Sequence, residues 1–410
     1  PQLTSLTLSK LHLLVEFKHC QMKKNGNNLL NSLLFIPLIM GFLLCGCSIV
    51  AKRQLSDESL QTTQQPADPC PQNATQSKAT KSVKIKESIV NPLTGLSISD
   101  AHILARRPVM IKVSNFPRIG RPHAGLSFAD IVFDYYIGYG TNRFLVVYYG
   151  QDSPQIGPVR SGRRVDAQLV NMYKGILGYG SADDETNQIL MQALGERAIS
   201  FEEAPCPAFC GTDTHSVVGV FANSAEITKF SQENSIDEGK VPNLTGMFFS
   251  PQTPAGGKLA KKVAILFNYY NRGEWRYDPS SGKYLRWIED MKDYEETFTM
   301  IPLVDRVTGE QLAFSNIIIL FAHYIEYAPS AHDIEILKNT EGEQMILFRD
   351  GQMFTGTWKT AGNTEPIQFF NPEGNPIMLK PGNSWIVIAE ERSIFDEPNP
   401  GEWKMFFFIP

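Results

Sequence analysis

The chain has 410 residues, of which 42% are hydrophobic and 20% charged, and its formal net charge is −5. This hydrophobic content is sufficient for a packed core, and the length fits one large or two medium domains. The acidic balance argues against nucleic acid as a partner, because nucleic-acid interfaces are strongly basic.

An apolar run at residues 33–44 predicts where the protein resides. It follows Met22-Lys-Lys24 and leads into Leu44-Cys-Gly-Cys47. A positive segment, a short apolar run and a small-residue cleavage site are typical of an export signal, and the run is too short for a stable membrane span. The segment resembles a bacterial lipoprotein signal, in which Cys47 takes the lipid and becomes the mature N-terminus. A buried structural helix is the alternative.

Composition then divides the chain into segments. We expect a non-native upstream flank at 1–21, a signal peptide with its lipid-acceptor cysteine at 22–47, a disordered tether at 48–85, an N-terminal domain at 86–250, a β-rich C-terminal domain at 251–400 and a C-terminal segment at 401–410. Removing residues 1–46 takes away four lysines and Glu16, which leaves a formal charge of −8. The predicted location is therefore the extracytoplasmic face of the cell membrane, with the protein held by lipid rather than by a basic patch.

The first half mixes strands and helices. Strands are predicted at 109–113, 131–137 and 144–149, and helices at 100–105, at 163–173, from the acidic turn 183–185 to Gly195, and at 223–230. In the second half, strands are predicted at 263–270, 316–324, 345–349, 353–358, 367–370 and 385–388, separated by Gly and Pro turns that favour antiparallel hairpins. The expected fold class is α/β: a mixed, largely antiparallel layered sheet with a few helices in the N-terminal half and a β-rich C-terminal half.

Cys206 and Cys210 form the only close cysteine pair outside the signal. A disulfide across this Pro-containing turn is plausible in an oxidising compartment. A zinc site with Asp213 and His215 is the alternative, but the spacing matches no zinc motif, and no metal site is predicted.

The segment Gly157-Pro-Val-Arg-Ser-Gly-Arg-Arg164 precedes a predicted helix and is the strongest candidate for ligand binding. Ser161 is expected to cap the helix, and arginines beside free helix N–H groups hold phosphates and carboxylates. The predicted anion site consists of Arg143, Arg160, Ser161 and Arg163, with Asn115 and Arg121 behind them. The alternative is that these arginines form structural ion pairs with Asp130, Asp134, Asp166, Asp183 and Asp184.

Common catalytic signatures are absent: there is no G-x-S-x-G, no H-E-x-x-H, no P-loop and no complete G-x-G-x-x-G. His123 and His215 are the candidate general bases, although each is more often a hydrogen-bonded loop histidine. Asp183, Asp184 and Glu185 could hold a cation, but they fit better as residues that complement a helix dipole. No cofactor is predicted.

Several ordered motifs carry a family resemblance. They are Arg107-Pro-Val-Met-Ile-Lys-Val-Ser-Asn115, Arg121-Pro-His-Ala-Gly-Leu-Ser-Phe-Ala-Asp130, Thr141-Asn-Arg-Phe144 and Gly157-Pro-Val-Arg-Ser161, with Tyr284-Leu-Arg286, Gly356-Thr-Trp358 and Pro381-Gly-Asn-Ser-Trp385 in the second half. Together with the signal, they resemble the YerB-like lipoprotein family, a two-part domain of unknown function. Members often carry a His-Asp pair after the Tyr-x-Arg element, where this chain has Lys292-Asp293, which argues against a catalytic histidine there. The resemblance implies a mixed α/β fold, a lipid-anchored exported protein and no established activity.

The leading hypothesis is a non-catalytic envelope lipoprotein that binds an anionic or glycan ligand or a partner protein. One alternative is a cell-wall hydrolase or transferase that uses a histidine and a carboxylate. The other is a structural envelope scaffold in which all the arginines are internally paired.

Overall fold

The computed structural model describes residues 89–211, 218–291, 297–329 and 331–410. The predicted signal, Cys47 and the tether lie outside these residues.

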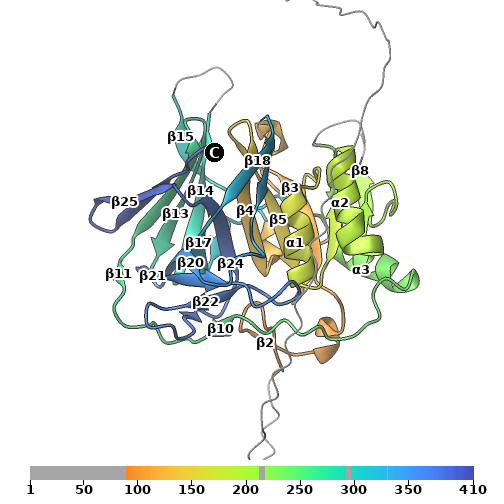
Figure 1. The fold of residues 1–410 in the computed structure, drawn as a ribbon, viewed down its shortest axis with the longest axis horizontal. Helices are drawn as coiled ribbons and strands as arrows, with labels where there is room; N and C mark the ends of the chain where they lie inside the picture. Colours follow the sequence, from red (N-terminus) through yellow and green to blue (C-terminus); the bar gives the residue numbers. More distant parts are fainter. Residues whose placement is uncertain (1–88, 212–217, 292–296, 330) are drawn as a thin grey trace, which may run out of the picture. The chain divides into compact units, whose positions relative to one another are not determined.

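A large mixed sheet forms the centre of the protein (Figure 1). Among the described residues it has eleven strands, in the order β11 (Lys258–Leu259), β21 (Gln352–Lys359), β20 (Glu343–Arg349), β17 (Asn316–Ala322), β24 (Ser384–Glu390), β4 (Ile131–Gly138), β5 (Thr141–Tyr148), β3 (Val109–Ser114), β6 (Ile176–Tyr179) and β7 (Ala198–Ser200), with β22 (Gln368–Phe370) beside β21. The two halves of the chain meet where β24 pairs in parallel with β4, Ser384 with Ile131 and Ile388 with Tyr135. The halves therefore share one hydrogen-bonded sheet.

A second, mostly antiparallel sheet belongs to the C-terminal half. Its seven strands in the described part of the chain are β15 (Thr299–Pro302), β14 (Lys283–Asp290), β13 (Asn271–Asp278), β12 (Lys262–Asn268), β26 (Glu402–Phe406) and β25 (Ile394–Asn399), with β16 (Ala313–Phe314) on β14. Trp385 of β24 joins the two sheets: its ring centroid lies 5.5 Å from that of Trp275 on β13 of the second sheet and 5.0 Å from that of Phe144 on β5 of its own sheet. Both tryptophans are fully buried. A core therefore lies between the two sheets, and large aromatic rings pack against one another in it.

Helices cover both faces of the N-terminal part of the large sheet. The described residues contain α1 (Arg164–Met172), α2 (Asp184–Leu194), α3 (Ser224–Glu233) and the short 3-10 helices η1 (Ala101–Leu104), η2 (Arg118–Gly120), η3 (Leu126–Phe128) and η4 (Gly195–Arg197). α1 and α2 pack beside each other (Figure 1), whereas α3 approaches the opposite face through Ile227, beside Gly178 of β6. Four two-stranded ribbons complete the description: β1 (Ile89–Val90) with β2 (Ser97–Ile98), β8 (Phe209–Gly211) with β9 (Val220–Ala222), β10 (Phe248–Phe249) with β23 (Met378–Leu379), and β18 (Tyr324–Ala328) with β19 (Ala331–Ile334).

The direction of the strands defines one edge of the large sheet. β3, β4, β6, β7, β17 and β24 all run the same way, so their C-terminal ends lie together; we call this the carboxyl edge. After β3, β4 and β5 the chain passes through α1, β6, α2 and β7, and α1 and α2 both begin at the carboxyl edge. In open α/β sheets this is the edge at which ligands bind. The N-terminus of the described chain is at the other edge, because Asn91 bonds to Asp130 directly before β4.

The expected fold class is confirmed: the chain forms mixed, layered sheets with few helices. The predicted helices at 163–173, 183–195 and 223–230 correspond to α1, α2 and α3, and the segment at 100–105 contains the 3-10 helix η1. β6 and β7 were missed, because each is only three or four residues long and lies directly after a helix.

Candidate anion-binding site

The loop before α1 lies across the ends of β3 and β6. The backbone N–H of Arg160 donates to the carbonyl oxygen of Lys112 (2.9 Å), and that of Gly180 donates to the carbonyl oxygen of Arg160 (2.9 Å). Gly162 N–H donates to Ser181 O at 2.8 Å. These bonds fix the loop at the carboxyl edge, beside the starts of both α1 and α2.

Three arginines meet at this place, and we call Arg143, Arg160 and Arg163 the arginine cluster. Arg143 reaches it from β5 and donates through Nη1 to the carbonyl oxygen of Ser161 at 2.6 Å. Burial, together with the charges of Arg163 and Arg160, lowers the pKa of Arg143 to about 9. Burial and the charge of Arg163 also lower the pKa of Arg160. The three cations are therefore close enough to repel one another.

In the described part of the chain the arginine cluster lacks a paired counter-ion, although the charge of Asp166 acts on Arg143 and that of Asp183 on Arg163 from beyond ion-pair distance. Among the residues that the structure describes, none of the three arginines forms an ion pair with a carboxylate. In the described chain, the side chain of Arg163 donates only to the neighbouring carbonyl oxygen of Gly162 (2.7 Å), and Nε of Arg160 is buried without a hydrogen-bond partner. Guanidinium groups are strong bidentate donors to phosphate and carboxylate, so an anion bound here would satisfy them and relieve their repulsion.

A buried polar group forms the base of the cluster. Lys112 of β3 and Asp166 of α1 are fully buried and form an ion pair at 3.0 Å, and the hydroxyl of Tyr135 contacts both. Burial lowers the pKa of Lys112 to about 7, against the opposing charge of Asp166. Asp166 also accepts the backbone N–H of Arg163 at 2.6 Å, which holds the start of α1 against the sheet.

Lys112 and Tyr135 did not emerge from the sequence as candidates. The available signal was a single lysine inside the otherwise apolar strand at 109–113, since a charge in such a strand requires a buried partner.

The expected capping role of Ser161 is wrong. α1 begins with Arg163 as its N-cap, and the carboxylate of Asp166 closes that turn. The Ser161 hydroxyl instead lies 3.2 Å from the Ser181 hydroxyl, which joins the two loops that precede the helices. Asp183 caps α2 by accepting the N–H of Thr186 (2.9 Å), as expected for residues that complement a helix dipole.

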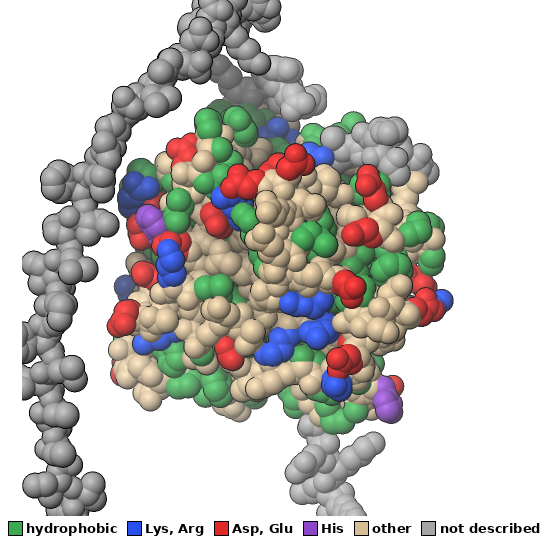
Figure 2. Space-filling view, turned by 45° about the vertical axis from the view of Figure 1, so that its right-hand side comes forward, with side chains coloured by type: hydrophobic (Ala, Val, Ile, Leu, Met, Phe, Trp, Pro, Cys, Tyr) green, Lys and Arg blue, Asp and Glu red, His purple; other side chains and the backbone are tan. Residues whose placement is uncertain are grey.

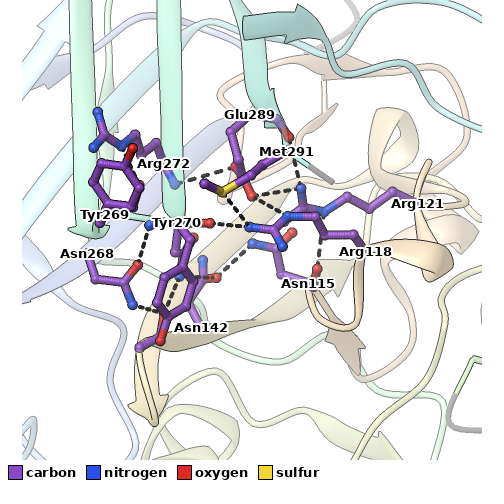
Figure 3. Close-up of polar contacts among 12 residues, drawn as sticks. Asn115, Arg118, Arg121, Asn142, Asn268, Tyr269, Tyr270, Arg272, Glu289 and Met291 are labelled. Atoms are coloured by element: carbon purple, nitrogen blue, oxygen red, sulfur yellow. Dashed lines mark hydrogen bonds and ion pairs between the residues drawn. The ribbon is translucent and has the colours of Figure 1, made fainter. Parts of the chain in front are cut away.

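Arg121 and Asn115 lie elsewhere, on the face toward the second sheet (Figure 3). Arg121 and Arg118 both contact the buried carboxylate of Glu289, at 2.9 and 3.2 Å. Asn115 donates to Asn142 (2.7 Å), the neighbour of Arg143 on β5. Because successive strand residues point to opposite faces, Asn142 and Arg143 belong to different sides of the sheet. The structure thus groups Arg143, Arg160, Ser161 and Arg163, and separates Arg121 and Asn115 from them.

His123 is unsuited to acid–base catalysis here. Its ring is fully buried, with its centroid 5.2 Å from that of Phe144. Neither ring nitrogen makes a well-formed hydrogen bond to a described residue, although the Ser114 backbone is near. Burial, together with the charges of Arg121 and Arg286, lowers its pKa to about 3. The second candidate base, His215, lies outside the described residues.

The predicted cysteine pair and its alternative zinc site involve residues that do not belong to the arginine cluster. Cys206 and Cys210 are joined by a disulfide, and Cys210 lies in β8, which pairs with β9. Asp213, the other residue of the zinc alternative, lies outside the described residues. In the described ranges, no group of three or more His, Cys, Asp or Glu side chains is arranged to hold a metal ion, and no helix is long and apolar enough to cross a membrane.

These observations define a two-sheet α/β protein with an arginine-rich carboxyl edge. Comparison with known proteins then identifies its family: the chain belongs to the two-part YerB-like family of proteins of unknown function (DUF3048), whose N-terminal domain matches residues 93–236 and whose C-terminal domain matches residues 263–386. It is 27% identical over 316 residues to the protein named "Putative lipoprotein YerB" of Bacillus subtilis (strain 168), a match that covers 73% of this chain and 86% of that protein. The crystal structure of YerB from Bacillus subtilis is similar, with a TM-score of 0.59 and 25% identity over 73% of this chain and 96% of that one.

Proposed function

We propose that this protein is a lipid-anchored envelope lipoprotein whose folded part binds an anionic ligand at the arginine cluster. The anchoring part of the proposal is supported by the lipoprotein-like signal that ends at Cys47 and by the name of the Bacillus subtilis relative. On this proposal, the folded part lies on the extracytoplasmic face of the cell membrane.

The binding part depends on one observation. Three arginines converge at the carboxyl edge, and in the described chain no carboxylate pairs with any of them. Arginines with a purely structural role are expected to pair with carboxylates, as Arg106 does with Asp152 at 2.8 Å. Each charge-assisted hydrogen bond to a bound anion contributes about 1.5–3 kcal/mol, so losing one arginine weakens binding by about tenfold to a hundredfold.

Titration calorimetry tests the binding part, with the full chain in detergent at low salt and pyrophosphate as the probe. We expect Arg160→Gln and Arg163→Gln to weaken binding by at least about tenfold. Lys240→Gln is the matched control, because it removes one charge from a side chain that is 80% exposed and belongs to another surface. Equal affinities in all four proteins would refute the arginine cluster as a binding site.

The anchoring part has its own test. Cells that express the wild type or Cys47→Ala are labelled with a clickable palmitate analogue and fractionated. We expect the label and the membrane association to require Cys47. A labelled, membrane-bound Cys47→Ala protein would refute this attachment.

A further inference from the structure

Three turns lie side by side at the carboxyl edge, on the side of the sheet that faces β12 and β13 (Figure 3). They are the β4–β5 turn around Tyr139, the β12–β13 turn with Tyr269 and Tyr270, and η2, which includes Ile119. We call these four residues the aromatic rim. Their side chains are exposed: Tyr139 by 74%, Tyr269 by 53%, Tyr270 by 42% and Ile119 by 80%.

Hydrogen bonds hold the turns of the rim together. Asn268 and Asn271 both donate to the carbonyl oxygen of Gly140, at 2.8 and 3.0 Å, and the Tyr270 hydroxyl donates to the carbonyl oxygen of Tyr139 at 3.3 Å. Arg118 of η2 donates to the carbonyl oxygen of Tyr270 and also forms an ion pair with Glu289. The exposed rings are therefore presented in a preorganised arrangement, which lowers the entropy cost of binding.

The backbone of the β4–β5 turn does not require a tyrosine at position 139, which is the most exposed ring of the rim. Tyr139 has a φ of +51° between Gly138 and Gly140, in the left-handed region where a side chain is disfavoured and glycine is preferred. Its side chain is mostly in solvent, so packing does not explain it either. Exposed aromatic residues grouped on one rigid surface are typical of a binding surface.

The rim and the arginine cluster lie on opposite sides of the β4–β5 hairpin. Tyr139 is at the tip of this hairpin and Arg143 is four residues further along the chain, a separation of at most roughly 13 Å at strand spacing. A ligand that lies across this hairpin would meet cations on one side and aromatic rings on the other.

We infer that the ligand of the arginine cluster is an anionic glycan, whose charged groups bind the arginines and whose sugar rings stack on the aromatic rim. This inference rests on the proposed function and names the class of its ligand. Sugar rings present flat C–H faces and polar edges, which suit exposed tyrosine rings with their hydroxyl groups, whereas a protein partner would require a larger and more apolar central patch.

The test compares three probes on the full chain in detergent by fluorescence anisotropy: labelled oligogalacturonate as an anionic glycan, polyglutamate as an anionic peptide, and a neutral chitooligosaccharide. Tyr139→Gly removes the ring while relieving the backbone strain, so it should fold. We expect this substitution to lower the affinity for oligogalacturonate at least about fivefold and to leave the affinity for polyglutamate unchanged, since stacking on an aromatic ring contributes measurably to affinity. The chitooligosaccharide should bind wild type weakly, because it lacks the charge.

Controls separate the outcomes. Tyr139→Phe keeps the ring and should bind oligogalacturonate like the wild type, and Phe248→Ala removes a ring that is 42% exposed on a different ribbon. An unchanged oligogalacturonate affinity in Tyr139→Gly, or no binding of this probe to the wild type, would overturn the glycan inference. Equal losses for both polyanions would favour an acidic peptide and overturn it too. If Arg163→Gln still weakens the binding of pyrophosphate in these cases, the proposed anion-binding function stands and only the assignment of a glycan ligand fails.

Discussion

Replacing His123 by Phe should change how the stability of the fold depends on pH. The imidazole is fully buried against Phe144, and its pKa falls from the ordinary 6.5 to about 3, chiefly through burial. The folded protein therefore keeps this side chain neutral, while the unfolded chain takes up a proton below about pH 6.5. The contribution of His123 to the free energy of unfolding is therefore fully present above pH 6.5 and is lost as the pH falls toward 3.

The magnitude follows from the two pKa values. Each pH unit between them changes the free energy of unfolding by about 1.4 kcal/mol, so the wild type should lose about 3 kcal/mol between pH 7.5 and 4.5 through this residue. Asp130 and Asp134, whose pKa values burial raises to about 6, act in the opposite direction, but they are present in both proteins and cancel in the comparison.

The assay is urea unfolding followed by tryptophan fluorescence at both pH values. Relative to the wild type, His123→Phe should gain about 3 kcal/mol between pH 7.5 and 4.5. Phe preserves the aromatic edge contact, so the variant should remain folded. If the difference between the two proteins is the same at both pH values, His123 titrates normally in the folded state and the reasoning fails.

Three further predictions concern stability. Asp166→Asn leaves Lys112 buried beside like charges and should cost about 3–5 kcal/mol in urea unfolding; a loss below about 1 kcal/mol would show that the buried pair is not needed. Cys206→Ser with Cys210→Ser opens a five-residue loop and should lower stability by about 2 kcal/mol, seen as a lower Tm; an unchanged Tm would contradict this. Trp385→Ala creates a cavity between the sheets and should cost about 3–5 kcal/mol by urea unfolding, and a cost near zero would contradict the packing described.

Local features of the sequence predicted the local features of the fold. The helix that begins in the acidic turn at 183–185 is α2, because Asp183 caps it and Gly195 ends it. The β-branched run at 131–137 is β4, since such side chains favour a strand that is covered on both faces. The pairing of β4 with β24 was not predictable, because these strands are about 250 residues apart and nothing local specifies which strands meet.

The same limit applies to the candidate site. The segment at 157–164 was located because arginines before a helix start form a recognisable pattern. Whether Arg143 joins it depends on strand register, since a shift of one residue moves a side chain to the other face of the sheet, and the position of Arg121 depends on the path of the loop after η2. Arg143 points to α1, whereas Arg121 contacts Glu289 on the side of the second sheet.

The most direct test of the arginine cluster is to locate a bound anion. Crystals of the wild type and of Arg163→Gln are soaked in selenate, and the selenium is located by anomalous diffraction. We expect a selenium peak within hydrogen-bond reach of the guanidinium groups of Arg160 and Arg163 in the wild type, and its loss in the variant. Selenium peaks only at other surfaces, or the same peak in both proteins, would contradict it.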